Sequence, residues 1–110
     1  MKIEIKNADC GDLIVELTGD FDALGSREIR EGLENITSQT TPEVVFLDLG
    51  GVSFIDSSGV GSIVFLFKGL RKRCRRLEIT GVHGQPRELL ELLRIHKAIP
   101  VQPTRGERLH

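Results

Sequence analysis

The residues best placed to do chemistry are the tetrapeptide Asp56-Ser57-Ser58-Gly59, which joins a strand-like segment to a helix-like one. Residues 44–49, VVFLDL, are apolar and β-branched, which predicts a buried strand. We expect Gly50-Gly51 to break that strand and residues 52–55 to form a second short apolar piece. The next apolar residues recur at helical spacing on one face: Val60, Ile63, Val64, Phe67, Leu70 and Cys74.

The two serines are therefore predicted to lie at a helix N-terminus. Unpaired backbone N–H groups and the positive end of the helix dipole favour a negative charge there. Such a corner suits a phosphate. A purely structural reading is also open, in which Ser57 caps the helix and Gly59 allows a tight turn. Capping explains one serine, but it does not explain an acid and two hydroxyls together.

Other chemistry is disfavoured. The histidines are His83, His96 and His110, none is placed beside Ser57 by sequence, and no G-x-S-x-G nucleophile elbow is present. The chain also lacks a P-loop and a kinase signature. Cys10 and Cys74 are expected to be two reduced thiols rather than a disulfide or a metal site. We expect no enzyme activity, no metal and no cofactor.

Size and composition indicate one ordinary globular domain. The chain has 110 residues, 39% hydrophobic and 28% charged. No apolar run approaches the roughly 20 residues that span a bilayer, and the N-terminus does not resemble a signal peptide. We therefore expect a cytoplasmic protein without membrane insertion. Residues 1–60 hold twelve acids and four bases, whereas residues 61–110 hold four and eleven.

The basic residues from Lys68 to Arg76 raise the question of nucleic acid. The chain has no Trp or Tyr for base stacking, and its net charge is −1. A solvated helix end, where cations complement the dipole, is the better interpretation. We expect no nucleic-acid binding, although part of this run could face an acidic partner.

The remaining segments predict a two-layer α/β domain. Residues 2–6 and 13–17 alternate and should form a hairpin, with the first strand near an edge. A helix over residues 24–38, capped by Asp22 or Ser26, should bury Ile29, Leu33 and Ile36. Pro42 closes the loop after it. A strand at 77–80, a helix that begins at Pro86 and an edge strand at 98–101 complete the order β-β-α-β-α-β-α-(β). The third helix should bury a leucine-rich stripe: Leu89, Leu90, Leu92, Leu93 and Ile95. The sheet is expected to be mixed, with four to five strands and three helices.

Phe65 is predicted to point away from the buried face of the second helix, together with Gly61, Ser62, Gly69 and Lys72. It lies two turns past the serines, between residues small enough for close approach. We interpret Phe65 as a candidate partner contact.

The segment FLDLGGVSFIDSSGVGSIVFLFKGLRKR resembles the signature of STAS domains, in particular bacterial anti-sigma factor antagonists. Upstream, residues 17–22, LTGDFD, are similar to the family's L-x-G-[ED]-[LIF]-D, and the spacing of residues 77–82 and of the Leu-rich helix also fits. The similarity covers about residues 3–101, so residues 1–110 are expected to be one STAS domain with a flexible tail at 102–110.

The resemblance implies a partner-switching mechanism. Ser57 would be the phosphoacceptor of a serine kinase that is also the anti-sigma factor, with Ser58 as the second choice. The unphosphorylated chain would bind that partner and free sigma, the phosphorylated chain would not bind, and a serine phosphatase would reset it. ATP and Mg²⁺ would come with the kinase. The chain itself is expected to be a monomer or a weak dimer.

The docking surface is expected at the corner and along the outer side of the second helix: Asp20, Asp22, Asp56, Ser57, Ser58, Gly59, Gly61, Ser62 and Phe65. Two alternatives stay open. The domain could regulate another partner, such as a lipid-transport ABC complex, a cyclase or a secretion regulator. It could also be a module that binds a nucleotide at the same helix N-terminus.

Overall fold

The computed structural model describes residues 1–8, 11–38 and 43–102. Within these residues, a five-stranded mixed sheet runs in the order β1-β2-β3-β4-β5, and three α-helices connect its strands after the first pair. The elements are β1 (Lys2–Asn7), β2 (Leu13–Phe21), α1 (Ala23–Ser38), β3 (Val44–Ile55), α2 (Ser57–Lys72), β4 (Arg76–Thr80), α3 (Gly84–Leu92), η2 (Ile95–Lys97) and β5 (Val101–Gln102). The predicted fold class and element order are confirmed.

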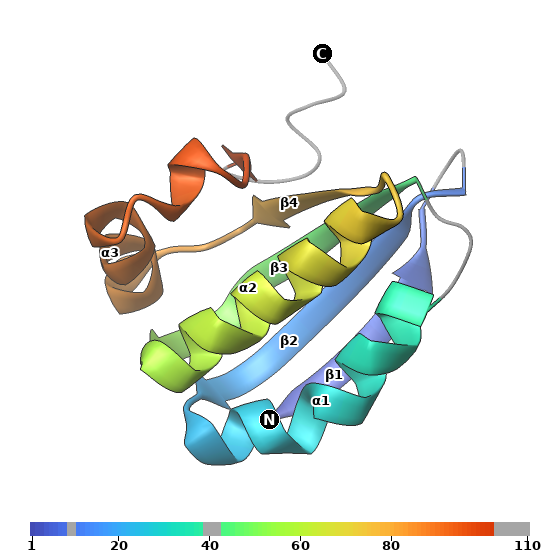
Figure 1. Ribbon diagram of the computed structural model, residues 1–110. Coiled ribbons are helices and arrows are strands. Elements are labelled where there is room, and N and C mark those ends of the chain that lie inside the picture. The colour runs from blue at the N-terminus through green and yellow to red at the C-terminus, as the bar shows by residue number, and fades with distance from the viewer. Residues whose placement is uncertain (9–10, 39–42, 103–110) are drawn as a thin grey trace.

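Strand pairing follows the expected hairpin and crossovers. β1 pairs antiparallel with β2, whereas β2, β3, β4 and β5 pair in parallel through helical connections. α1 and α2 lie side by side across one face of the sheet, and α3 lies past the carboxyl end of β4 (Figure 1). The main core fills the space between the two helices and the sheet. Ile29, Leu33 and Ile36 of α1 are buried there, as predicted.

The expected break at Gly50-Gly51 is wrong, because β3 runs without interruption from Val44 to Ile55. The strand continues through the two glycines because its register with β2 shifts twice. The shifts lie between Glu16 and Thr18 and between Gly19 and Asp20 of β2. A Cβ on Gly51 would lie 3.0 Å from the Leu17 carbonyl oxygen. The glycine thus marks a close backbone approach inside a strand rather than its end.

The buried face of α2 differs from the prediction. Its buried residues are Gly59, Ile63, Leu66 and Leu70, whereas Val60, Val64 and Phe67 are half-buried and Cys74 is exposed beyond the helix. Residues 63–67 are all apolar, so helical periodicity alone allows several faces. Packing against α1 and the sheet selects one of them.

The C-terminal third also departs from expectation. α3 begins two residues before Pro86, at Gly84, and of the five predicted stripe residues only Leu90 is buried, together with Pro86. Leu92 and Leu93 are exposed, 77% and 49%. Arg94 then adopts φ 58°, which turns the chain into η2, so α3 ends before the stripe can reach the core. The edge strand is present at 101–102, and Gln102, which the sequence assigns to the tail, pairs there with Thr80.

Three predictions fall on residues 9–10, 39–42 and 103–110, which lie outside the described part of the chain: the state of Cys10, the loop at Pro42 and the tail. None of the helices in the described ranges is both long enough and apolar enough to cross a membrane.

Candidate functional site

Two parallel strands end side by side at the corner that the sequence singled out. Phe21 at the end of β2 pairs with Ile55 at the end of β3, and the Asp56 N–H donates to the Phe21 carbonyl oxygen at 3.2 Å. Each strand is followed by an aspartate and then by a helix. The corner therefore presents two equivalent strand–aspartate–helix junctions next to each other.

The two aspartates cap the helices that follow them. The Asp22 carboxylate accepts from the Gly25 N–H at 2.8 Å. One Asp56 carboxylate oxygen accepts from the Ser58 N–H at 2.9 Å and from the Gly59 N–H at 3.2 Å. These three bonds satisfy N–H groups that the first helical turn leaves unpaired. Asp22 rather than Ser26 is thus the cap of α1, and Asp56 rather than Ser57 is the cap of α2.

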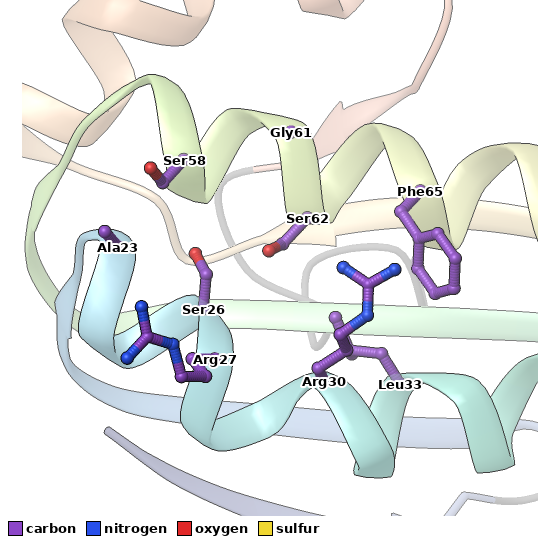
Figure 2. Close-up of a pocket in the computed structure, with 9 residues that line it drawn as sticks. All are labelled: Ala23, Ser26, Arg27, Arg30, Leu33, Ser58, Gly61, Ser62 and Phe65. Atoms are coloured by element: carbon purple, nitrogen blue, oxygen red, sulfur yellow. The ribbon is translucent and has the colours of Figure 1, made fainter.

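The two serines have different surroundings, although both lie in the first turn of α2 as predicted. Ser57 is the first residue of the helix and is exposed. Ser58 is half-buried and its side chain points toward α1 (Figure 2). The Ser57 hydroxyl is therefore more accessible to an enzyme in solution than the Ser58 hydroxyl.

Gly59 lies below the surface. A Cβ at this position would overlap the Phe21 carbonyl oxygen and would lie 2.6 Å from Cγ1 of Ile55. Real Cβ atoms essentially never come so close, so only glycine lets the start of α2 cross the end of β2. Gly59 is buried and positions the corner through packing, so it does not belong to the predicted docking surface.

A groove of about 530 Å³ lies between α1 and α2. Figure 2 shows the residues that line it: Ala23, Ser26, Arg27, Arg30 and Leu33 from α1, and Ser58, Gly61, Ser62 and Phe65 from α2. The fold therefore brings four of the predicted site residues together in one depression. It also adds Arg27 and Arg30, which sequence reasoning missed because their partners lie on another helix.

Phe65 differs from the prediction of an outward-pointing side chain. It is half-buried, packs against the core and lies under the Arg30 guanidinium, whose carbon is 5.1 Å from the ring centroid. Such stacking is a cation–π contact. The residue that covers Phe65 comes from α1, so the sequence of α2 alone, residues 57–72, could not predict this contact.

Asp20 lies on the opposite side of the sheet from the groove. It is exposed and pairs in register with Phe54, whereas their neighbours Phe21 and Ile55 face the core. Phe54 is 43% exposed and Leu24, in the first turn of α1, is 61% exposed. The sequence analysis did not predict that Phe54 and Leu24 are exposed at this end of the molecule. The alternation of Phe54 with the buried Ile55 along β3 could have indicated that Phe54 is exposed.

Gln85 holds the end of β3 in place. Its side-chain oxygen accepts from the Ile55 N–H at 2.9 Å, and its side-chain nitrogen donates to the Ile55 carbonyl oxygen at 2.8 Å. β4 pairs with β3 only as far as Asp48, so the Gln85 amide takes the place of a neighbouring strand one residue before Asp56. His83 Nε2 lies 3.0 Å from the Gly50 carbonyl oxygen on the same edge.

Comparison with known proteins agrees with this geometry. Residues 2–108 match the family model described as the STAS domain. The chain belongs to the STAS-domain family. The resemblance drawn from the Asp-Ser-Ser-Gly segment is thereby confirmed, and the STAS domain accounts for nearly the whole sequence.

The relatives of this STAS domain include named regulators. It is 31% identical over 107 residues to the anti-sigma-B factor antagonist of Listeria monocytogenes, an alignment that covers 97% of this chain and 93% of the relative. It is 28% identical over 91 residues to the anti-sigma F factor antagonist of Paenibacillus polymyxa, covering 83% and 78%. The crystal structure of an anti-sigma factor antagonist from Mycobacterium paratuberculosis superposes with a TM-score of 0.87 at 19% identity, over 98% of this chain and 90% of that one. The last comparison concerns the fold alone.

Proposed function

We propose that this STAS domain is an anti-sigma factor antagonist that works by partner switching in the cytoplasm. Unphosphorylated, it binds an anti-sigma factor that is also a serine kinase; phosphorylated on Ser57, it is released; a serine phosphatase restores it. The observation that carries the proposal is the exposed Ser57 at the first position of α2, directly after the capping Asp56. The antagonists from Listeria and Paenibacillus among its relatives support the general role.

Exposure favours Ser57 over Ser58 as the phosphoacceptor. A kinase must bring the γ-phosphate of ATP in line with the hydroxyl, which requires space around the oxygen. Ser57 is exposed, whereas Ser58 is half-buried in the groove beside α1. Phosphorylation of Ser58 would require the kinase to reach between two helices.

Phosphorylation is expected to act on the interface and not on the fold. A phosphate adds about −1.5 to −2 charge at pH 7. At the first turn of α2 the helix dipole stabilises that charge, so the domain stays folded. For a partner seated on the corner, the same group is a bulky anion beside the carboxylates of Asp20, Asp22 and Asp56. Release follows from steric conflict and added negative charge at the interface.

The docking surface that we propose surrounds Ser57. It comprises the three aspartates, of which Asp20 lies on the far side of the sheet, the two serines, the exposed Gly61 and the half-buried Ser62 and Phe65: Asp20, Asp22, Asp56, Ser57, Ser58, Gly61, Ser62 and Phe65. The exposed Phe54 and Leu24 extend it with apolar area at the same end of the molecule. Apolar side chains at the centre of an interface, surrounded by polar groups, are the usual source of binding energy.

Incubation with ATP, Mg²⁺ and each serine kinase encoded near the gene tests the proposal. We expect a mass increase of one phosphate in the wild type and in Ser58→Ala, no increase in Ser57→Ala, and loss of kinase binding after modification. Ser58→Ala is the matched control because it removes the adjacent hydroxyl from the same helical turn. Phosphorylation that persists in Ser57→Ala, or binding that is unchanged by phosphate, would contradict the proposal.

A further inference from the structure

Three serine side chains line the groove between α1 and α2. Ser58 and Ser62 project from α2, and Ser26 projects from α1 (Figure 2). The Ser26 hydroxyl oxygen is buried and has no hydrogen-bond partner within residues 1–8, 11–38 and 43–102. Among the described residues, no hydrogen bond uses the side-chain oxygen of Ser58 or Ser62 either. A buried hydroxyl without a partner is unfavourable, so Ser26 favours an acceptor that enters the groove beside the half-buried Ser58 and Ser62.

Two guanidinium groups border the same groove. Arg27 and Arg30 lie on the α1 side, and the ion pairs found within the described residues include neither of them. Glu31 and Glu34, each one turn further along α1, form no ion pair with them in the part of the chain that the structure describes. The Arg30 guanidinium lies over the Phe65 ring, and this cation–π contact holds its charge at the groove. Within the described residues, the groove thus combines two guanidinium groups that belong to no ion pair with three serine hydroxyls.

We propose that this groove binds a phosphoryl group between Arg27, Arg30 and the hydroxyls of Ser26, Ser58 and Ser62. A phosphoryl group has three terminal oxygens that accept hydrogen bonds, and arginine binds such an anion through two parallel N–H bonds. A carboxylate has only two oxygens and leaves more of these donors unused. The nearby N-terminus of α2 adds a favourable dipole. The site goes beyond the proposed function, since it needs neither Ser57 nor a kinase.

A phosphate titration of the unmodified full chain tests the site. Amide chemical shifts are followed by two-dimensional NMR while inorganic phosphate replaces chloride at constant ionic strength. We expect saturable shifts at Ser26, Ser58 and Ser62, and affinity about tenfold weaker in Arg27→Gln, because a charged hydrogen-bonding partner is lost. Arg87→Gln is the matched control. It removes the same charge from α3, where Arg87 pairs with Glu91, and it should leave phosphate affinity unchanged.

The phosphoryl group could belong to a free molecule or to Ser58 itself, and a second arm separates the two sources. Phosphoserine is installed at position 58, and its phosphorus resonance is compared with and without Arg27→Gln. If the attached group occupies the groove, Arg27→Gln shifts that resonance and free phosphate no longer binds. If the site serves free phosphorylated molecules, the unmodified chain binds phosphate and the resonance at position 58 does not depend on Arg27. The proposal is overturned if the unmodified chain shows no saturable binding and the resonance is also independent of Arg27, or if Arg27→Gln and Arg87→Gln weaken binding equally.

The test distinguishes this site from the partner switch. Kinase-dependent modification of Ser57 can fail while the unmodified chain still binds phosphate. Conversely, the switch can operate in a chain whose groove binds nothing.

Discussion

Gly59 packs directly against the backbone of Phe21, and no residue with a side chain fits at this position. A Cβ on Gly59 would lie 2.9 Å from Cγ of Phe21 and would overlap the Phe21 carbonyl oxygen. The first turn of α2 therefore rests directly on the end of β2. This contact sets the position of Ser57, two residues earlier, relative to the aspartates that follow β2 and β3.

Gly59→Ala should destabilise the domain. The added methyl group meets backbone atoms that cannot move without disturbing β2, and overpacking of this kind typically costs about 1–3 kcal/mol. Gly61→Ala is the control in the same helix, because its Cβ would meet nothing within 4 Å. That variant should be more stable by about 0.5–1 kcal/mol, the usual gain from alanine in a helix. Chemical denaturation measures both, and equal stability of the two variants would contradict the contact.

Asp56→Ala should lower the free energy of unfolding by about 1 kcal/mol, because the N–H groups of Ser58 and Gly59 lose their acceptor. Asp56→Asn should keep most of that stability, since asparagine caps helices about as well as aspartate. Comparison of Asp56→Ala with Asp56→Asn distinguishes the contribution of helix capping from that of the carboxylate charge. If the carboxylate also contributes to docking, Asp56→Asn changes the affinity for the kinase while thermal unfolding stays near the wild-type temperature. A large loss of stability in Asp56→Asn would show that the charge itself supports the fold.

Ser57→Asp should leave the domain folded and slightly more stable at low ionic strength. A carboxylate in the first turn of a helix gains about 0.3–1 kcal/mol from the helix dipole, and added salt screens that gain. Thermal unfolding at low and high salt measures the effect, and kinase binding is measured on the same sample. We expect binding to be lost although the fold is intact. Unfolding caused by Ser57→Asp would mean that phosphate acts on the domain and not on the interface.

Gln85→Leu should loosen the end of β3. It removes the partner of both the N–H and the carbonyl oxygen of Ile55, and two lost hydrogen bonds correspond to about 1–3 kcal/mol. Hydrogen exchange at the Ile55 amide should quicken by at least about tenfold. Glu88→Leu, at an exposed position of the same helix, is the control and should not change that amide. Unchanged protection of Ile55 in Gln85→Leu would contradict the role that we assign to the amide.

Phe65→Ala is expected to weaken kinase binding and also to cost some stability, because Phe65 packs against the core and carries Arg30. Phe54→Ala tests the apolar area beside Asp20 with a smaller effect on the fold, since Phe54 belongs to neither core cluster. Leu92→Ala, on the exposed end of α3, is the control and should bind as the wild type does. The affinity of each variant for the kinase is measured by calorimetry. If Phe65→Ala binds normally, Phe65 serves the packing of α1 and α2 alone.

Local patterns in the sequence were enough for the order of the elements and for the corner at Asp56-Ser57-Ser58-Gly59. Strand alternation, helix caps and turn residues act over a few neighbouring residues, so they can be read from one segment at a time. The same patterns placed Ile29, Leu33 and Ile36 in the core, because α1 has a single apolar stripe. The family signature lies in this local information as well.

Only the tertiary structure decided which face of α2 is buried and which residues of α1 lie across the groove from its serines. α2 is apolar on more than one side, and contact with β2 at Gly59 and with α1 at Phe65 selects the buried face. The meeting of Ser58 and Ser62 with Arg27 and Arg30, and of Gln85 with Ile55, joins residues about thirty positions apart. Such contacts depend on the packing of whole elements against each other, and no local pattern records that packing.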